Sequence, residues 1–268
     1  MVVALATVPA AALPSLAVKP APSLAEQPAL WVLSDADTTV YLFGTFHALD
    51  DRTDWFARNI RAAFDSSDEL VLETLVPTNP AELFATLSRH SLTAPIVVGA
   101  PVVARGRSGS FAASAGQTMA AGKAAGLSVE RGADAMLRRI ADSQGKPVDG
   151  LESFDFQLNM FATLPNPAPA AIKTPQPDVK RLLLDMRSAW KRGDASSFAT
   201  VLVSLEAQSP TTYQRLFVDR NNDWARWIAE RMERPGTVFV AVGTGHLIGR
   251  DSVQQKLTGH GFTATRIH

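Results

Sequence analysis

The sequence predicts an α/β fold in which a mixed, mostly parallel central sheet is flanked by helices. Short apolar runs that end in glycine or in a polar residue alternate with longer segments of helical periodicity, as is typical of such sheets. The tetrapeptide Gly-Thr-x-His follows two of these runs, at residues 44–47 and 243–246, which gives a pseudo-repeated strand-loop unit. A chain of 268 residues is long enough to bury one sizeable core.

The first half of the chain is expected to begin with a hairpin. Segments 31–34 and 39–43 are strand-like, and the triplet 35–37 between them is rich in turn residues. Helix 54–66 then leads into strand 69–72, which completes a parallel, right-handed β-helix-β unit. The elements expected next are helix 81–89, helix 115–125, strand 127–130, helix 133–143 and strand 148–151.

From about residue 154 to about residue 234 the pattern becomes helical, which predicts a helical insertion. Five prolines between residues 165 and 177 indicate a loop, and helices are expected at 179–192, 196–207 and 211–233. The apolar run 238–242 then predicts a central strand buried on both faces. Asp251 is expected to cap helix 252–257, and segment 262–267 is suited to an edge strand.

Composition limits the classes of function. Lys plus Arg and Asp plus Glu each number 26, so there is no basic excess of the kind that a nucleic-acid partner would require. The hydrophobic content of 46% and the charged content of 19% are those of a globular protein. The absence of cysteine excludes disulfides, thiolate metal ligands, a cysteine nucleophile and lipoprotein anchoring.

The first 27 residues differ from the rest of the chain. No charged side chain occurs between residues 2 and 18, where Ala, Val, Leu and Pro dominate. This predicts a signal-like segment, or alternatively a disordered Ala/Pro-rich tail, followed by a single domain over residues 28–268. A signal implies a periplasmic or secreted bacterial protein, and a tail implies a cytoplasmic one. Prolines at positions 9 and 14 argue against a transmembrane anchor.

Polar side chains stand at the ends of four predicted strands. His47 and His246 close the two Gly-Thr-x-His motifs, and Glu73 and Glu152 follow two further apolar runs. Because α/β sheets bind ligands outside the carboxyl ends of their strands, we expect these four residues to share one site. Imidazole and carboxylate groups together suit either a divalent metal ion or the acid–base chemistry of a hydrolase.

Two further features extend this candidate site. Arg220 and Asn221 interrupt the apolar stripe of helix 211–233, so their polar groups must be satisfied or functional. Arg220 would bind a substrate carboxylate or stabilise an oxyanion, and Asn221 would orient a ligand. Gly44 and Gly243 are expected to allow the backbone to approach a substrate closely.

In their order and spacing these motifs resemble the TraB/PrgY/GumN family, whose animal relatives include the Tiki proteases. The blocks that carry the resemblance are residues 41–47, 67–73, 145–152 with Gln157, 220–224 and 242–261. The resemblance implies a hydrolase-like fold with both GxxH histidines and a glutamate at the site, and Tiki-type members are regarded as metal-dependent proteases that favour Mn or Co. The fold is also similar to that of erythromycin-esterase-like and ChaN-like proteins. Residues 77–126 match poorly, which leaves the substrate open.

These residues are compatible with three functions. The first is a metal-dependent hydrolase, most simply a peptidase, with Arg220 at the oxyanion. Its divalent ion (Mn, Co or Zn) would be held by His47, Glu73, Glu152 and His246. The second is a metal-free, esterase-like hydrolase in which His47 activates water and Glu73 orients the imidazole. The third is a non-catalytic protein that binds a peptide or a small molecule in the same cleft, and the sequence leaves the oligomeric state open.

Overall fold

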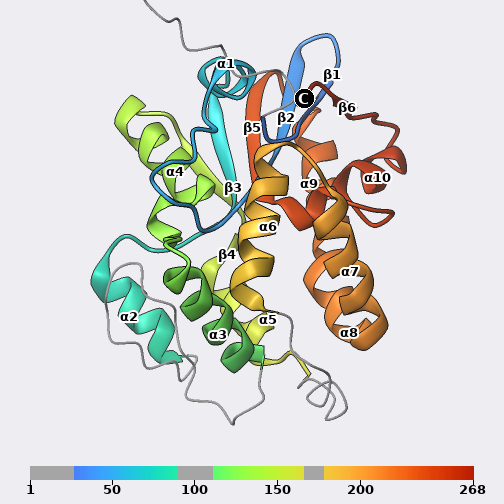
Figure 1. Cartoon of the computed structure of the whole chain (residues 1–268). Helices are drawn as coiled ribbons and strands as arrows, with labels where there is room; N and C mark the ends of the chain where they lie inside the picture. The colour runs from blue at the N-terminus through green and yellow to red at the C-terminus, as the bar shows by residue number, and fades with distance from the viewer. Residues whose placement is uncertain (1–26, 90–110, 166–177) are drawn as a thin grey trace, which may run out of the picture.

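The computed structural model describes residues 27–89, 111–165 and 178–268 (Figure 1). Within these ranges the centre is a six-stranded sheet with the order β4-β3-β5-β2-β1-β6. The parallel strands are β2 (Thr38–Thr45), β3 (Glu69–Leu75), β4 (Val148–Ser153) and β5 (Gly236–Gly243), and β1 (Leu30–Ser34) and β6 (Thr265–Arg266) join antiparallel at one edge. The predicted mixed, mostly parallel sheet is confirmed.

Helices flank both faces of this sheet, and others lie below it in the view of Figure 1. In chain order they are α1 (Arg58–Asp65), α2 (Pro80–Arg89), α3 (Phe111–Ala124), α4 (Ala133–Gln144), α5 (Phe154–Ala162), α6 (Val179–Lys191), α7 (Ser196–Gln208), α8 (Pro210–Tyr213), α9 (Asp219–Arg231) and α10 (Val253–Thr258). A π-helical turn, Gln214–Val218, joins α8 to α9. The helical stretch predicted between about 154 and 234 is confirmed wherever the structure describes it; residues 166–177, which hold most of the proline-rich loop, lie outside the described residues.

The β1–β2 hairpin forms where the sequence predicts it. The carboxylate of Asp35 makes the turn by accepting hydrogen bonds from the backbone N–H groups of Asp37 and Thr38, at 3.2 and 2.9 Å. On the other side β2 pairs in parallel register with β5. The two Gly-Thr-x-His motifs are therefore carried by neighbouring parallel strands.

Alternate side chains of β5 build a core on each face of the sheet. Val238, Val240 and Val242 pack against α9 and α10, whereas Phe239 and Ala241 pack against α1, α4 and α6. All five are buried, as expected for a central strand of a sheet that is covered on both sides. β5 is thus the central strand that the apolar run predicted.

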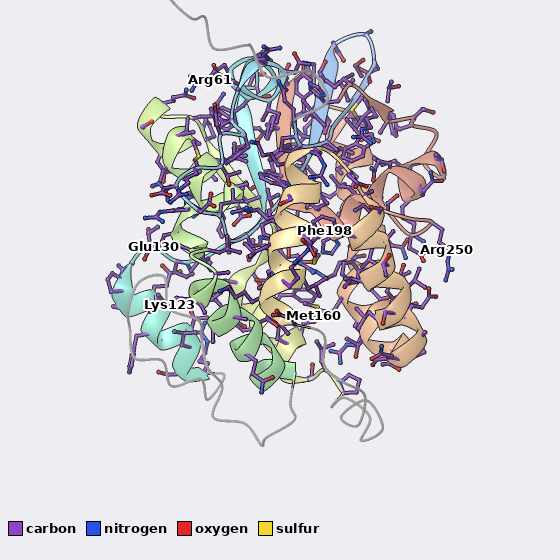
Figure 2. The ribbon with its side chains drawn as sticks, in the orientation of Figure 1. Arg61, Lys123, Glu130, Met160, Phe198 and Arg250 are labelled. Atoms are coloured by element: carbon purple, nitrogen blue, oxygen red, sulfur yellow. The ribbon has the colours of Figure 1, made fainter. Side chains whose placement is uncertain are left out.

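Trp190 of α6 anchors the first motif to the larger of these cores. Its indole N–H donates to the carbonyl oxygen of Gly44 at 2.7 Å, which provides the partner that a buried tryptophan needs. Its ring centroid lies 6.0 Å from that of Phe46 and 5.8 Å from that of Trp55. Phe198 of α7, labelled in Figure 2, meets Phe46 edge-on at 6.1 Å. The end of β2 is therefore fixed from the helical side.

Segment 127–130 is not the strand that its composition predicts. Leu49 and Ser128 form an isolated antiparallel bridge, and Val129–Arg131 is a 3-10 turn. The Ser128 hydroxyl accepts the backbone N–H of Glu130 at 3.2 Å, which starts this turn locally. The segment pairs only with Leu49, in the loop after β2, and not with a strand of the sheet. It therefore does not form a strand itself.

The C-terminal region also differs from the prediction. Ser252, not Asp251, is the N-cap residue of α10. The Asp251 carboxylate instead accepts hydrogen bonds from Lys256 Nζ at 2.8 Å and from the Tyr213 hydroxyl at 3.2 Å, so it is not available as a cap. The predicted strand 262–267 is an edge strand but is shorter than expected: Thr265 and Arg266 pair with β1, and the Ile267 N–H donates to the Leu30 carbonyl oxygen at 2.9 Å.

The N-terminal prediction is largely outside the structure, because the described part of the chain begins at residue 27. The signal-like segment 1–27, the location that it implies and the domain start at residue 28 stay predictions. No helix in the described ranges combines the length and the apolar composition that crossing a membrane requires.

The core predicts a specific cost of truncation. Ile228 of α9 has no exposed surface and packs in the core with β5. We expect Ile228→Ala to lower the free energy of unfolding by about 2–5 kcal/mol. The truncation removes buried apolar atoms and leaves a cavity that the neighbouring side chains fill only in part. Urea denaturation followed by circular dichroism measures this change. Val203 of α7 is 66% exposed, so Val203→Ala should change stability by less than about 0.5 kcal/mol; equal effects of the two variants would contradict the assigned core.

Candidate functional site

The two Gly-Thr-x-His motifs lie against each other at the ends of β2 and β5. Thr45 pairs with Gly243, and the Thr244 hydroxyl donates to the Thr45 carbonyl oxygen at 2.8 Å. A methyl group on Gly44 would stand 2.9 Å from Thr244 Oγ1, so a larger residue would push the motifs apart. In this structure Gly44 serves the contact between the motifs, and its predicted contact with substrate stays a prediction.

The two motif histidines have opposite environments. The side chain of His47 is 59% exposed, whereas the residue His246 is only 5% exposed. The difference arises in the backbone, because Thr244–Leu247 forms a 3-10 turn after β5 that turns His246 into the core. The two motifs therefore have the same structure only in their strands, and they differ in the turns that follow.

His246 is held as a neutral imidazole. Asn221 Nδ2 donates to the Asp251 carbonyl oxygen at 2.7 Å, so Asn221 Oδ1 is the atom that faces His246 Nδ1 at 2.6 Å. Nδ1 must therefore carry the proton, and Nε2 accepts from Arg220 Nη1 at 3.2 Å. Burial lowers the pKa of His246 to about 3. Both ring nitrogens are occupied, and Asn221 is the residue that positions the ring.

Arg220 is the centre of a buried polar cluster. Its Nε donates to Glu152 Oε1 at 2.6 Å, and its Nη2 donates to Glu152 Oε2 at 2.9 Å and to Glu73 Oε1 at 2.6 Å. Its Nη1 donates to the Leu216 carbonyl oxygen at 3.1 Å and to His246. All five N–H groups of the guanidinium thus have protein acceptors, and Arg220 is 4% exposed. The predicted oxyanion or carboxylate ligand would have to displace one of these acceptors.

The π-helical turn before α9 contributes to this cluster. It supplies the Leu216 carbonyl, and such turns occur frequently at functional sites. The guanidinium carbon of Arg220 also lies 4.7 Å from the ring centroid of Trp224, one helical turn further on. Arg220, which interrupts the apolar stripe in the sequence, therefore has all its hydrogen-bond donors satisfied inside the protein.

Glu73 connects this cluster to the edge of the site. Its Oε1 also accepts from Gln157 Nε2 at 3.0 Å, and its Oε2 accepts the backbone N–H of Gly243 at 3.0 Å. Burial raises the pKa of Glu73, but the positive charge of Arg220, supported by that of His47, outweighs burial and holds the pKa below its ordinary value. For Glu152, burial outweighs the same guanidinium and keeps the pKa above its ordinary value.

Asp134 is the site residue that the sequence analysis missed. It is the second residue of α4, and its Oδ1 lies 2.9 Å from His47 Nδ1. An ionised carboxylate only accepts hydrogen bonds, so Nδ1 carries a proton in both charge states of the ring, and Nε2 is the nitrogen that gains or loses the second proton. The negative charge of Asp134 raises the pKa of His47 to about 9. The residue that orients the imidazole is therefore Asp134, not Glu73 as the metal-free hypothesis predicted.

Close backbone packing places α4 against the loop after β2. The Ala133 N–H donates to the Phe46 carbonyl oxygen at 3.0 Å. A methyl group on Gly132 would stand 2.2 Å from the His47 carbonyl oxygen, so glycine is needed at this contact. The only local sequence signal at Asp134 was an acid in a first helical turn, which did not point to His47.

Most of the predicted metal ligands are directed at the guanidinium of Arg220 and do not converge on an open position where a metal ion could lie. Glu152 and His246 direct their polar atoms to the guanidinium, as does Glu73 Oε1. His47 Nε2 and Glu73 Oε2 both lie close to Gly243, at 3.0 and 3.3 Å from the position that a methyl group there would occupy. Within the described ranges, no three His, Asp or Glu side chains are arranged to hold a metal ion. The four residues do not fit one divalent ion in this arrangement, and metal binding stays a prediction.

The fold and the site together define an α/β protein with a buried Arg–Glu–His cluster and an exposed His–Asp pair at the carboxyl ends of its parallel strands. The model of the TraB/PrgY/gumN family matches residues 29–95 and 81–266. The chain belongs to the TraB/PrgY/gumN family, as its motifs predicted.

Two curated proteins are similar to part of the chain. They bear the name "Uncharacterized protein YbaP", from Escherichia coli (strain K12) and from Shigella flexneri, and each is 33% identical over 135 residues. The match covers 49% of this chain and 50% of each relative, so the chain spans about half the length of the curated relatives that it matches. No solved structure matches the chain. These names state no activity, so function is inferred from the site.

The cluster predicts a large effect of removing its cation. Arg220→Met leaves Glu73 and Glu152 buried without their partner, and we expect it to lower the free energy of unfolding by about 3–5 kcal/mol. Urea denaturation measures the loss. The variant Arg220→Met/Glu73→Gln/Glu152→Gln also removes both carboxylates, so it should recover much of this stability. If the single and triple variants were equally unstable, the ion pairs would not be the source of the effect.

The histidine environments predict distinct titrations. His47 should titrate near pH 9, and Asp134→Asn should move it toward the ordinary value of about 6.5, because the charge that stabilises the imidazolium is lost. Side-chain NMR of the histidines follows both rings in one sample. His246 serves as the internal control and should stay neutral throughout the range. An unchanged His47 titration in Asp134→Asn would contradict the pairing.

Proposed function

We propose that this protein is a hydrolase in which His47 acts as general base on a water molecule and Asp134 orients its imidazole. The observation that carries the proposal is the exposed His47–Asp134 pair, in which Nδ1 is fixed at 2.9 Å and Nε2 is left without a protein partner among the described residues. The pair lies at the carboxyl end of β2, where α/β proteins bind their ligands. A histidine placed in this way contributes roughly 10²–10⁴-fold to a rate.

The reaction would begin with proton transfer from water to His47 Nε2. The water oxygen adds to the substrate carbonyl carbon, and the resulting imidazolium is stabilised by the Asp134 carboxylate, which keeps its own charge. When the tetrahedral intermediate collapses, Nε2 returns the proton to the leaving group. An ester or a peptide bond fits this chemistry. Arg220 is a positioning residue here, since it holds Glu73 beside the base.

The resemblance to Tiki-type proteins favours a peptidase that uses Mn, Co or Zn as a second candidate. The observation that supports it is that two of the predicted ligands, His47 Nε2 and Glu73 Oε2, both lie close to Gly243. Two donors are fewer than the three protein ligands of ordinary catalytic zinc sites, so no step is assigned to a metal here.

The proposal predicts how activity depends on His47 and on pH. Assays with nitrophenyl esters and fluorogenic peptides should show that His47→Ala lowers kcat by about 10²–10⁴-fold. The neutral imidazole is the active base and its pKa is raised to about 9, so the rate should increase with pH up to that value. In Asp134→Asn this rise should move to lower pH while the maximal rate falls, because orientation is lost.

The controls separate this proposal from its alternatives. His260 is exposed in the turn after α10 and belongs to neither motif, so His260→Ala should leave activity unchanged. EDTA should have no effect. Loss of activity with EDTA and recovery with Mn, Co or Zn would contradict the metal-free proposal and support the second candidate. Binding of peptide without hydrolysis, unaltered in His47→Ala, would instead favour a non-catalytic binding protein.

A further inference from the structure

A basic hollow lies between the loop after His47 and the last turns of α6. Its volume is about 410 Å³. Charged and polar side chains line it, among them Asp50, Arg52, Thr53, Arg187, Lys191 and Arg192. The hollow shares no lining residue with the Arg220 cluster or with the His47–Asp134 pair, so it is a separate feature of the molecule.

The cations reach this hollow from two walls. Arg187 and Lys191 are four residues apart on α6 and therefore project from the same side of the helix, with Arg192 beside them. Arg52 comes from the loop opposite. Cations on two facing walls can contact one anion from both sides, which a single row along a helix cannot do.

Asp50 makes the loop wall rigid. Its Oδ1 accepts from the Thr53 hydroxyl at 2.6 Å and from the Arg52 backbone N–H at 3.2 Å. Its Oδ2 accepts from Arg187 Nη1, which ties the loop to α6. Arg187 is thus held in place before any ligand arrives, and such preorganisation reduces the entropy that binding costs.

The charges in the hollow are not balanced by the protein. Asp50 pairs with Arg187, but Arg52 and Lys191 have no carboxylate within ion-pairing distance in the described ranges, and Arg192 reaches Asp194 only at 4.0 Å. The helix dipole favours cations in the last turn of α6, which accounts for Lys191. It accounts neither for Arg52 on the opposite wall nor for the like charges placed four residues apart, which repel each other.

We propose that this hollow binds the phosphate group of a small soluble molecule. Arginine side chains bind phosphate oxygens in a bidentate manner, and lysine adds a point charge, so the set Arg52, Lys191 and Arg192 suits a multiply charged oxyanion. The volume lies within the range of small-molecule sites, and the concave shape suits a compact ligand better than a flat membrane surface does.

Isothermal titration of the full chain with inorganic pyrophosphate tests this proposal. We expect saturable binding at one site, weakened about tenfold or more in Lys191→Gln/Arg192→Gln, because charge-assisted hydrogen bonds are lost. Lys180→Gln/Arg181→Gln is the matched control, since it removes the same charge from the exposed first turn of the same helix. It should bind pyrophosphate nearly as the wild type does. Arg52→Gln provides an independent variant on the other wall and should also weaken binding.

Each outcome of these titrations either supports or contradicts the proposed phosphate site. Selective weakening in Lys191→Gln/Arg192→Gln and Arg52→Gln, with unchanged far-UV circular dichroism, supports the site. Equal weakening in the control pair would show that only overall charge matters, and absence of saturable binding in the wild type would also overturn the proposal. Sedimentation with phosphatidylcholine vesicles that contain phosphatidic acid separates the two sources of phosphate: binding to vesicles but not to pyrophosphate would overturn a small-molecule site.

Discussion

The guanidinium of Arg220 holds together the segments that build the site. It binds Glu73 of β3, Glu152 of β4 and His246 of the turn after β5, which lie 147, 68 and 26 residues from it in sequence. Burying one cation with two carboxylates has a large desolvation cost, which is offset only when every donor has an acceptor. That condition is met here, so the cluster fixes the ends of three neighbouring strands relative to one another.

This cluster also explains why the two copies of one motif differ. His246 is used inside the protein as a neutral acceptor, with its ring fixed by Asn221. His47 lies outside the cluster, exposed, and pairs with Asp134 across a close contact at Gly132. The chain thus separates a structural histidine from a chemically available one, and this difference is the basis of the hydrolase proposal.

One loop serves both candidate sites. The segment after β2 carries His47 at its start, and three residues later Asp50 begins the wall of the basic hollow. Trp190 anchors α6 to the end of β2 through Gly44, while Arg187 of the same helix binds Asp50. The position of this loop therefore depends on α4 from one side and on α6 from the other.

The sequence by itself determined the sheet, its central strand, the hairpin and the placement of the strand-end residues at one edge of the sheet, because these follow from local periodicity and from the direction of parallel strands. Only the tertiary structure decided which histidine is exposed, since that depends on a short turn after β5. The role of Asp134 depends on the docking of α4 across 87 residues, which leaves no local pattern. The position of Arg220 among its acceptors was decided in the same way, because buried charges are paired by the fold and not by their neighbours in sequence.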